Sequence, residues 1–228
     1  MSEWWTYRPA DLLMFSPETY YRLFELHNQT LWPAQIGALA AGLAILALRF
    51  GQARWHGRAI AGLLAAVWLF VAWGYFFERY AAINLAAGIM GWAFVLQAAL
   101  LAASAAAGML SFSRMATWHA RAGMALLVFS LFLQPLIGPL AGRSWAGVEL
   151  FGMAPDPTVL ATLGVLVVAD RVRFVLLLIP LLWCVITGVT LWTMGAPDAL
   201  LMPAAGLLTL ALGLYGSLEA RTAHQPKS

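Results

Sequence analysis

The stretch that decides the fold is residues 147–164, GVELFGMAPDPTVLATLG. Its apolar helix is predicted to begin at Pro157 and to end thirteen residues later, before the next charged residue. At about 1.5 Å per residue such a helix is only ~20 Å long, whereas the hydrocarbon core of a bilayer is ~30 Å thick. Either segment 152–156 enters a membrane as irregular chain, or the helix begins earlier and carries Glu149 and Asp156. Both alternatives place carboxylates where they are costly.

The rest of the chain is strongly apolar. Of its 228 residues, 62% are hydrophobic and 10% are charged, whereas soluble domains have about 25% charged residues. A fold in water cannot cover this much apolar surface, so the composition predicts an all-α bundle of transmembrane helices. The net charge of +3 does not indicate nucleic-acid binding. Cys184 is the one cysteine, which excludes a disulfide within the chain, and the start MSEWWTYRP does not resemble a cleaved signal peptide.

About seven membrane spans are predicted, or six if the short fifth segment is re-entrant and leaves on the side that it entered. With the N-terminus outside, nine Lys and Arg residues fall on the inner side and four on the outer side, as the positive-inside rule requires. We therefore expect a multi-pass protein of the bacterial inner (cytoplasmic) membrane, with residues 31–216 as the bundle and 217–228 as a polar cytoplasmic tail. The predicted spans are residues 31–50, 58–77, 80–110, 121–140, 157–169, 174–194 and 199–216.

Residues 1–30 form an amphipathic segment before the first span. Ser16, Pro17 and Glu18 predict a helix start, because a hydroxyl cap, a proline and an acid suit those positions. We interpret this segment as an interfacial helix on the membrane surface, and the alternatives are a helix that faces a partner or caps the bundle. The residues that share its apolar face are Tyr20, Leu23, Phe24 and His27.

Asp156 is the central candidate among the residues that could bind a substrate. A carboxylate before a proline is typical of a helix N-cap, which is the structural alternative for Asp156. A helix start that points into the membrane from a broken segment is also how transporters bind ions. Thr158 and Thr162, four residues apart, would share one face of the same helix and complete the site.

Three further polar side chains are assigned to this substrate-binding site: Glu149, Gln134 and Gln97. Glu149 either lies at the headgroup level or pairs with Arg143 or Arg79. The two glutamines are expected to face the bundle, either bonded to one another or lining a path. We expect no metal and no cofactor, because no histidines share a helix at ligand spacing.

Several stretches resemble an uncharacterised family of bacterial multi-pass membrane proteins, a domain-of-unknown-function family. The resemblance implies a membrane class and no activity. It further implies that relatives carry a histidine after the fourth span and a cysteine before the Pro-Thr pair, where this chain has Arg143 and Asp156, so a thiol-based site would be absent. The stretches are YYRLFELHNQTLWPAQ, ERYAAINLAAG, QPLIGPLAGRSW followed by FGMAPDPTVLATLG, and RVRFVLLLIPLLWCVITG.

The sequence favours a permease or channel for a small solute or ion, with its site at the broken start of the fifth helix. The alternative is a non-catalytic accessory subunit of a larger membrane complex. An enzyme is less favoured, because no convincing acid and base pair is present. The expected partners are the lipid bilayer and either another membrane protein or a second copy of the chain.

Overall fold

The computed structural model describes residues 15–51, 53, 55–112 and 117–222, and this part of the chain contains helices and no strand. The predicted all-α class is confirmed. Residues 1–14 of the predicted interfacial segment and 223–228 of the tail lie outside the described residues. The α-helices are α1 Pro17–Thr30, α2 Ala34–Arg49, α3 Trp55–Val71, α4 Ala87–Ala107, α5 Trp118–Val128, α6 Gln134–Leu140, α7 Pro155–Val168, α8 Phe174–Thr193 and α9 Leu201–Thr222.

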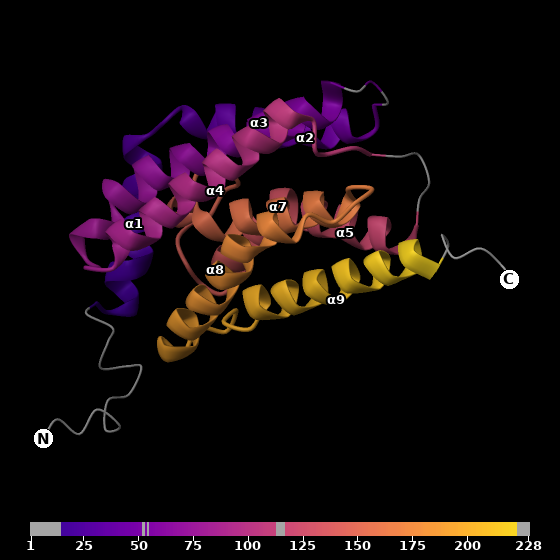
Figure 1. Cartoon of the computed structure of the whole chain (residues 1–228). Coiled ribbons are helices and arrows are strands. Elements are labelled where there is room, and N and C mark those ends of the chain that lie inside the picture. The colour runs from indigo at the N-terminus through magenta and orange to yellow at the C-terminus, as the bar shows by residue number, and fades with distance from the viewer. Residues whose placement is uncertain (1–14, 52, 54, 113–116, 223–228) are drawn as a thin grey trace, which may run out of the picture.

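Helix α7 is the element around which the others pack. Helices α2, α3 and α4 form one group, and α5, α8 and α9 lie on the other side of α7 (Figure 1). All fourteen residues of α7 are buried. Because the helix is apolar on every face apart from Asp156 and two threonines, complete enclosure is the arrangement that its sequence requires.

The predicted shortness of the fifth helix is confirmed, since fourteen residues span about 21 Å. The helix begins at Pro155, two residues earlier than expected, so Asp156 lies inside it and Glu149 lies outside it. The preceding turn, 151–154, is not helical and is buried. It requires Gly152, whose φ of +74° is left-handed, and whose hypothetical Cβ would lie 3.1 Å from Ala38 Cβ.

Two glycines allow α5 and α7 to approach each other at backbone distance. A Cβ on Gly164 would lie 2.7 Å from the carbonyl oxygen of Gly123, and a Cβ on Gly123 would lie 2.8 Å from that of Gly164. Small residues permit such close packing between apolar helices. This contact fixes the position of α7 against α5.

Helix α7 runs from one end of the bundle to the other. The turn before it lies against α1, where His27 Nε2 is 3.1 Å from the carbonyl oxygen of Met153. After its C-terminal end, the backbone N–H of Asp170 donates to the carbonyl oxygen of Ser111, 2.9 Å away, beyond the far end of α4. The chain therefore does not turn back along α7, as the re-entrant alternative required.

The predicted number of seven spans, or six, is higher than the number of helices that are long and apolar enough to cross a membrane. Within the described residues four helical segments are long and apolar enough to cross a membrane, and α1 with α2, bent by 94°, would make a fifth. Helix α7 and the apolar part of α9 are shorter. The four segments are Trp55–Ala82, Ala87–Ala107, Trp118–Leu140 and Phe174–Thr193.

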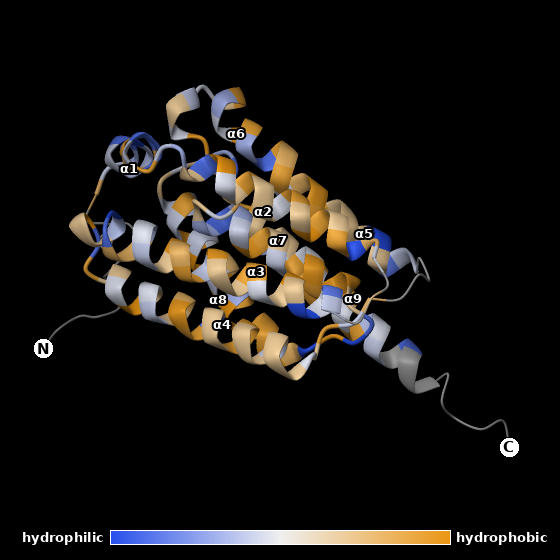
Figure 2. Ribbon diagram, turned by 90° about the horizontal axis from the view of Figure 1, so that it is seen from above, coloured by the Kyte–Doolittle hydropathy of each residue, from blue (hydrophilic) through white to orange (hydrophobic). Residues whose placement is uncertain are grey.

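The outer surface of the helices is apolar, while many polar side chains lie inside. Figure 2 shows apolar residues along the lengths of the helices and hydrophilic ones mainly near their ends. Leu39, Ile89, Leu96, Leu178 and Leu207 are among the exposed aliphatic residues. Buried polar residues include Gln97, Ser104, Ser130, Gln134, Asp156, Thr158, Thr162, Thr187 and Thr209.

Helix α1 begins as predicted, with Ser16 Oγ accepting from the backbone N–H of Thr19 at 3.3 Å. The face predicted to be apolar is buried, but against protein. The Phe24 ring stacks on Tyr75, with ring centroids 5.3 Å apart, in the π-helical turn Ala72–Phe77 that continues α3. This face therefore packs against the bundle, as the capping alternative requires, and the position of α1 at a membrane surface stays a prediction.

Candidate functional site

Asp156 is held by two side chains of α8. Its Oδ1 accepts a hydrogen bond from Trp183 Nε1 at 2.7 Å, and its Oδ2 accepts one from Thr187 Oγ1 at 3.0 Å. All three side chains are buried. The expectation that Asp156 caps its own helix is wrong, because α7 is preceded by Ala154 without a side-chain cap. The carboxylate instead joins the start of α7 to the middle of α8.

The Trp183 indole is held in place by contacts with two phenylalanine rings. It packs edge-on against Phe76 and against Phe94, with ring centroids 5.3 Å apart in both pairs. Trp183 is on α8, and its indole packs against the π-helical turn after α3 and against α4. Its N–H therefore has a defined direction. Asp156 therefore has a fixed orientation as well.

A second carboxylate pair surrounds Arg143, in the loop between α6 and α7. Arg143 Nη2 donates to Asp198 Oδ2 at 2.6 Å, and Arg143 Nη1 lies 3.8 Å from Glu149 Oε1. The guanidinium also lies over the Tyr21 ring, 4.5 Å from its centroid. The pairing of Glu149 with Arg143, one of the two partners expected from sequence, is confirmed at this distance.

The charged residues of both groups meet at one small cavity, which we call the acidic cavity. Its volume is about 20 Å³, enough for a single water molecule. Gln134 also lines it, is 6% exposed, and carries a buried Oε1 without a hydrogen-bond partner in the described part of the chain. The charged residues that line it are Arg143, Glu149, Asp156 and Asp198.

The balance of charge around the acidic cavity is negative, because three carboxyl groups face one guanidinium. Burial, together with the nearby carboxylates of Asp156 and Asp198, raises the pKa of Glu149 to about 8 against the opposing effect of Arg143. Asp156 is compensated by its two donors and Asp198 by Arg143. Glu149 has the weakest compensation of the three, since its closest cationic atom is 3.8 Å away.

The structure brings together three of the six residues predicted for the site, namely Asp156, Glu149 and Gln134. Their role in binding stays a prediction. Thr158 and Thr162 lie on α7 but do not line the acidic cavity. Thr158 Oγ1 accepts from the backbone N–H of Gly152 at 2.9 Å, and Thr162 Oγ1 accepts from Trp68 Nε1 at 2.8 Å. The two hydroxyls therefore bond α7 to the turn that precedes it and to α3.

Gln97 lies apart from the acidic cavity. Its Nε2 donates to the carbonyl oxygen of Leu176 at 2.9 Å and joins α4 to α8, so the expected hydrogen bond between Gln97 and Gln134 is absent among the described residues. Two threonines of α8 differ in their partners. Thr190 Oγ1 donates to the carbonyl oxygen of Ile186 on its own helix at 2.9 Å, whereas Thr187 Oγ1 donates to Asp156 on α7.

Sequence reasoning missed Asp198, Trp183 and the role of Thr187. Asp198 had a usable signal, since it is the one charged residue between the apolar stretches of α8 and α9. A charge in such a position is costly unless it is paired. Trp183 had no comparable signal, because tryptophans are common in this chain and only packing shows which one donates to Asp156.

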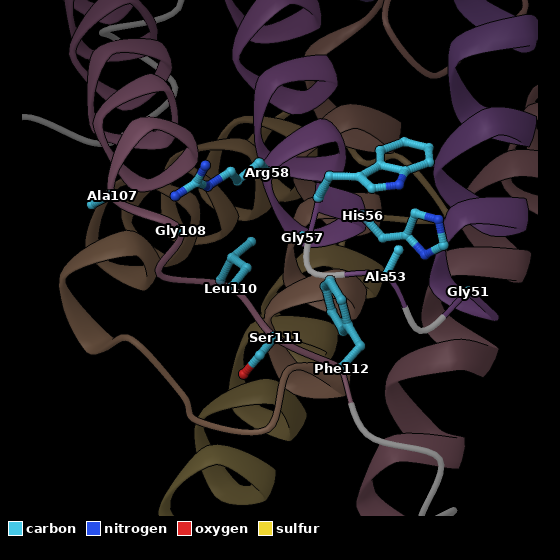
Figure 3. A pocket seen from close by; sticks show the side chains of 11 residues that line it. Gly51, Ala53, His56, Gly57, Arg58, Ala107, Gly108, Leu110, Ser111 and Phe112 are labelled. Carbon is cyan, nitrogen blue, oxygen red and sulfur yellow. The ribbon is translucent and has the colours of Figure 1, made fainter.

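A larger cavity, about 650 Å³, lies at the opposite end of the bundle between the start of α3 and the chain that follows α4 (Figure 3). Its lining side chains include Arg58, His56 and Ser111, and none of the predicted site residues. Among the described residues, no group of three His, Cys, Asp or Glu side chains is placed to hold a metal ion.

The chain belongs to a family of unknown function (DUF6064), whose profile matches residues 17–224. This match confirms the resemblance to a domain-of-unknown-function family. No curated protein and no solved structure matches the chain. The bacterial origin implied by the resemblance stays a prediction.

Proposed function

We propose that this protein is a multi-pass membrane protein that conducts or transports a small ion, with its binding site at the acidic cavity. The apolar outer surface and the buried polar residues support insertion into a bilayer, because exposed aliphatic side chains cover the long helices. The predicted inner side is the end that carries Arg49, Arg58, Arg121 and Arg171. The bacterial inner membrane and the outside position of the N-terminus belong to the same proposal.

The single observation that carries the ion assignment is the convergence of three carboxyl groups and an unpaired amide oxygen on one buried cavity. Ionisable residues inside apolar bundles are expensive, and in membrane proteins they commonly mark ion or proton pathways. The volume of about 20 Å³ favours an ion over a larger solute. The π-helical turn Phe129–Leu133, directly before Gln134, gives α5 and α6 a point at which they can bend.

The test is a flux assay with the purified full chain in phosphatidylcholine and phosphatidylglycerol liposomes, with protons, Na⁺ and K⁺ as probes. We expect flux of at least one ion, and a loss of about tenfold or more in Asp156→Asn and in Gln134→Leu. Thr190→Val is the matched control, since Thr190 lies on α8 one turn from Thr187 and bonds only to its own helix. Undiminished flux in both site variants, or no flux in the wild type, would reject the assignment.

The second candidate is an accessory subunit of a larger membrane complex. It is favoured by the position of Gln97, which does not line the acidic cavity and instead donates to the carbonyl oxygen of Leu176. Exposed tryptophans could contact a partner chain, among them Trp32, Trp92, Trp145 and Trp192. Purification in mild detergent with one partner in fixed stoichiometry, together with absent flux, would support this candidate over the first.

A further inference from the structure

In the part of the chain that the structure describes, one carboxylate of the acidic cavity lacks a hydrogen bond, and two buried acceptor oxygens of its lining residues lack a donor, Gln134 Oε1 and Asp198 Oδ1. Within the described residues no hydrogen bond reaches Glu149, whose contact is the ion pair with Arg143 at 3.8 Å. Gln134 Oε1 is buried and has no hydrogen-bond partner among these same residues. Both side chains line the same cavity. A single proton on Glu149 would supply the donor that Gln134 Oε1 lacks, because it converts the carboxylate into a carboxylic acid with an O–H group.

We propose that the acidic cavity is a proton-binding site, in which Glu149 takes up one proton and donates it in a hydrogen bond to Gln134 Oε1, directly or through one water. The carboxylate becomes a carboxylic acid, and no other bond is made or broken. This inference deepens the proposed function, on which it rests for the view that the proton is the transported ion.

The surroundings of Glu149 explain why this residue, and not its neighbours, accepts the proton. Both oxygens of Asp156 already accept hydrogen bonds, and Asp198 has the guanidinium of Arg143 at 2.6 Å. Protonation of Glu149 lowers the negative charge of the cavity while the pair between Arg143 and Asp198 stays intact. The raised pKa of Glu149, about 8, agrees with this assignment.

Three phenols also face Glu149 from α1 and from the turn after α3. They are Tyr20, Tyr21 and Tyr75. With ordinary pKa values near 10, phenols are neutral at the pH at which Glu149 titrates. Glu149 is therefore the group expected to change charge near pH 8.

The cavity volume is consistent with a proton and limits other occupants. About 20 Å³ holds one water molecule. A hydrated metal cation needs several oxygen ligands and additional waters, which this space does not provide. A water between Glu149 and Gln134 would relay the proton without any change in the packing of α6 or α7.

The experiment is infrared difference spectroscopy of the full chain in lipid nanodiscs, with the pH stepped across 8. We expect the carbonyl band of a protonated carboxylic acid to be lost as the pH rises, and to be missing in Glu149→Gln. Glu78→Gln is the control, because Glu78 lies exposed at the same end of the bundle. In Gln134→Leu the midpoint should move to lower pH, since the protonated acid loses its acceptor.

Two outcomes would overturn the proposal: no titrating carboxyl band on either side of pH 8, or the same band in Glu149→Gln. The solvent exposure of the thiol of Cys184, buried in the wild type, checks that each variant is folded. Proton flux into liposomes that contain a pH-sensitive dye separates this inference from the proposed function. A titrating Glu149 without any ion flux supports the proton site and rejects transport. Na⁺ or K⁺ flux without a titrating Glu149 supports transport and rejects the proton site.

Discussion

Replacing Asp156 by alanine removes the acceptor of two buried donors that belong to another helix. Trp183 Nε1–H and Thr187 Oγ1–H would then point at a methyl group, and neither side chain is exposed enough to reach water. A buried donor without an acceptor loses its interaction and keeps its desolvation cost. We therefore expect Asp156→Ala to be among the most destabilising substitutions in the bundle.

The size of the effect depends on the charge of Asp156. Hydrogen bonds to a charged group contribute about 1.5–3 kcal/mol each, so two such bonds give a loss of about 3–6 kcal/mol. Neutral hydrogen bonds between helices in a membrane protein average about 0.6 kcal/mol, which would give a loss of only about 1 kcal/mol. Relief of the buried charge offsets part of the first figure, and we expect a net loss of about 3 kcal/mol. Asp156→Asn, which keeps one acceptor oxygen, should lose about half as much.

Cys184 provides a direct assay of this prediction. It is the only cysteine and is 1% exposed, so a thiol-reactive fluorophore labels it only when the bundle opens. Unfolding of wild type, Asp156→Ala, Asp156→Asn and Thr187→Val in detergent gives the free-energy differences. Combining Asp156→Asn with Thr187→Val in a double-mutant cycle isolates the interaction between the two side chains. Far-UV circular dichroism is the second readout.

A change of less than about 0.5 kcal/mol in Asp156→Ala would refute the reasoning, because it falls below the loss expected even for two neutral hydrogen bonds. Equal losses in the alanine and asparagine variants would show that the acceptor oxygen kept by asparagine contributes nothing, since both substitutions remove the charge. A loss confined to Asp156→Ala, with no coupling to Thr187→Val, would assign the effect to Trp183 alone.

Gly164→Ala should destabilise the protein by about 1–3 kcal/mol in the same assay, because its Cβ would lie 2.7 Å from Gly123 O. Gly37→Ala is its control, as a Cβ there meets nothing within 4 Å, and an unchanged Gly164→Ala would contradict the close contact. Stability should also depend on pH through Glu149, whose pKa is about 8 in the folded protein and near the ordinary 4.5 when unfolded. The folded state then holds the proton more tightly, so its contribution is complete below pH 4.5 and is lost as the pH rises through 8. The melting temperature of the wild type should fall as the pH rises from 4.5 to 8, and this decrease should be smaller in Glu149→Gln. Equal decreases in the two proteins would contradict the assignment.

Local signals in the sequence predicted much of this structure. Ser16 and Pro17 gave the start of α1, and the spacing of Tyr20, Leu23, Phe24 and His27 gave its buried face. The short apolar run after Pro157 gave α7, because a helix length follows directly from residue count. The rarity of polar and charged side chains in apolar segments pointed to Asp156, Glu149 and Gln134, which the fold brings to one cavity.

The missed features depend on contacts between elements distant in sequence. Thr187 could have bonded to its own helix, as Thr190 does, and only the position of α7 decides otherwise. The same holds for Asp198, whose partner Arg143 is 55 residues away. The predicted number of spans was too high because two of the apolar runs, in α7 and α9, form apolar helices that are short for crossing a membrane.

The enclosure of α7 has a consequence for the order in which the chain assembles during synthesis. Trp183 and Thr187 follow Asp156 by 27 and 31 residues, so at about 5–20 residues per second they leave the ribosome roughly 1–6 s later. During that delay the carboxylate of Asp156 has neither of its native donors. The native docking of α7 must therefore wait for α8. In a nascent chain arrested between the two helices, we expect α7 not yet to be packed in its native position.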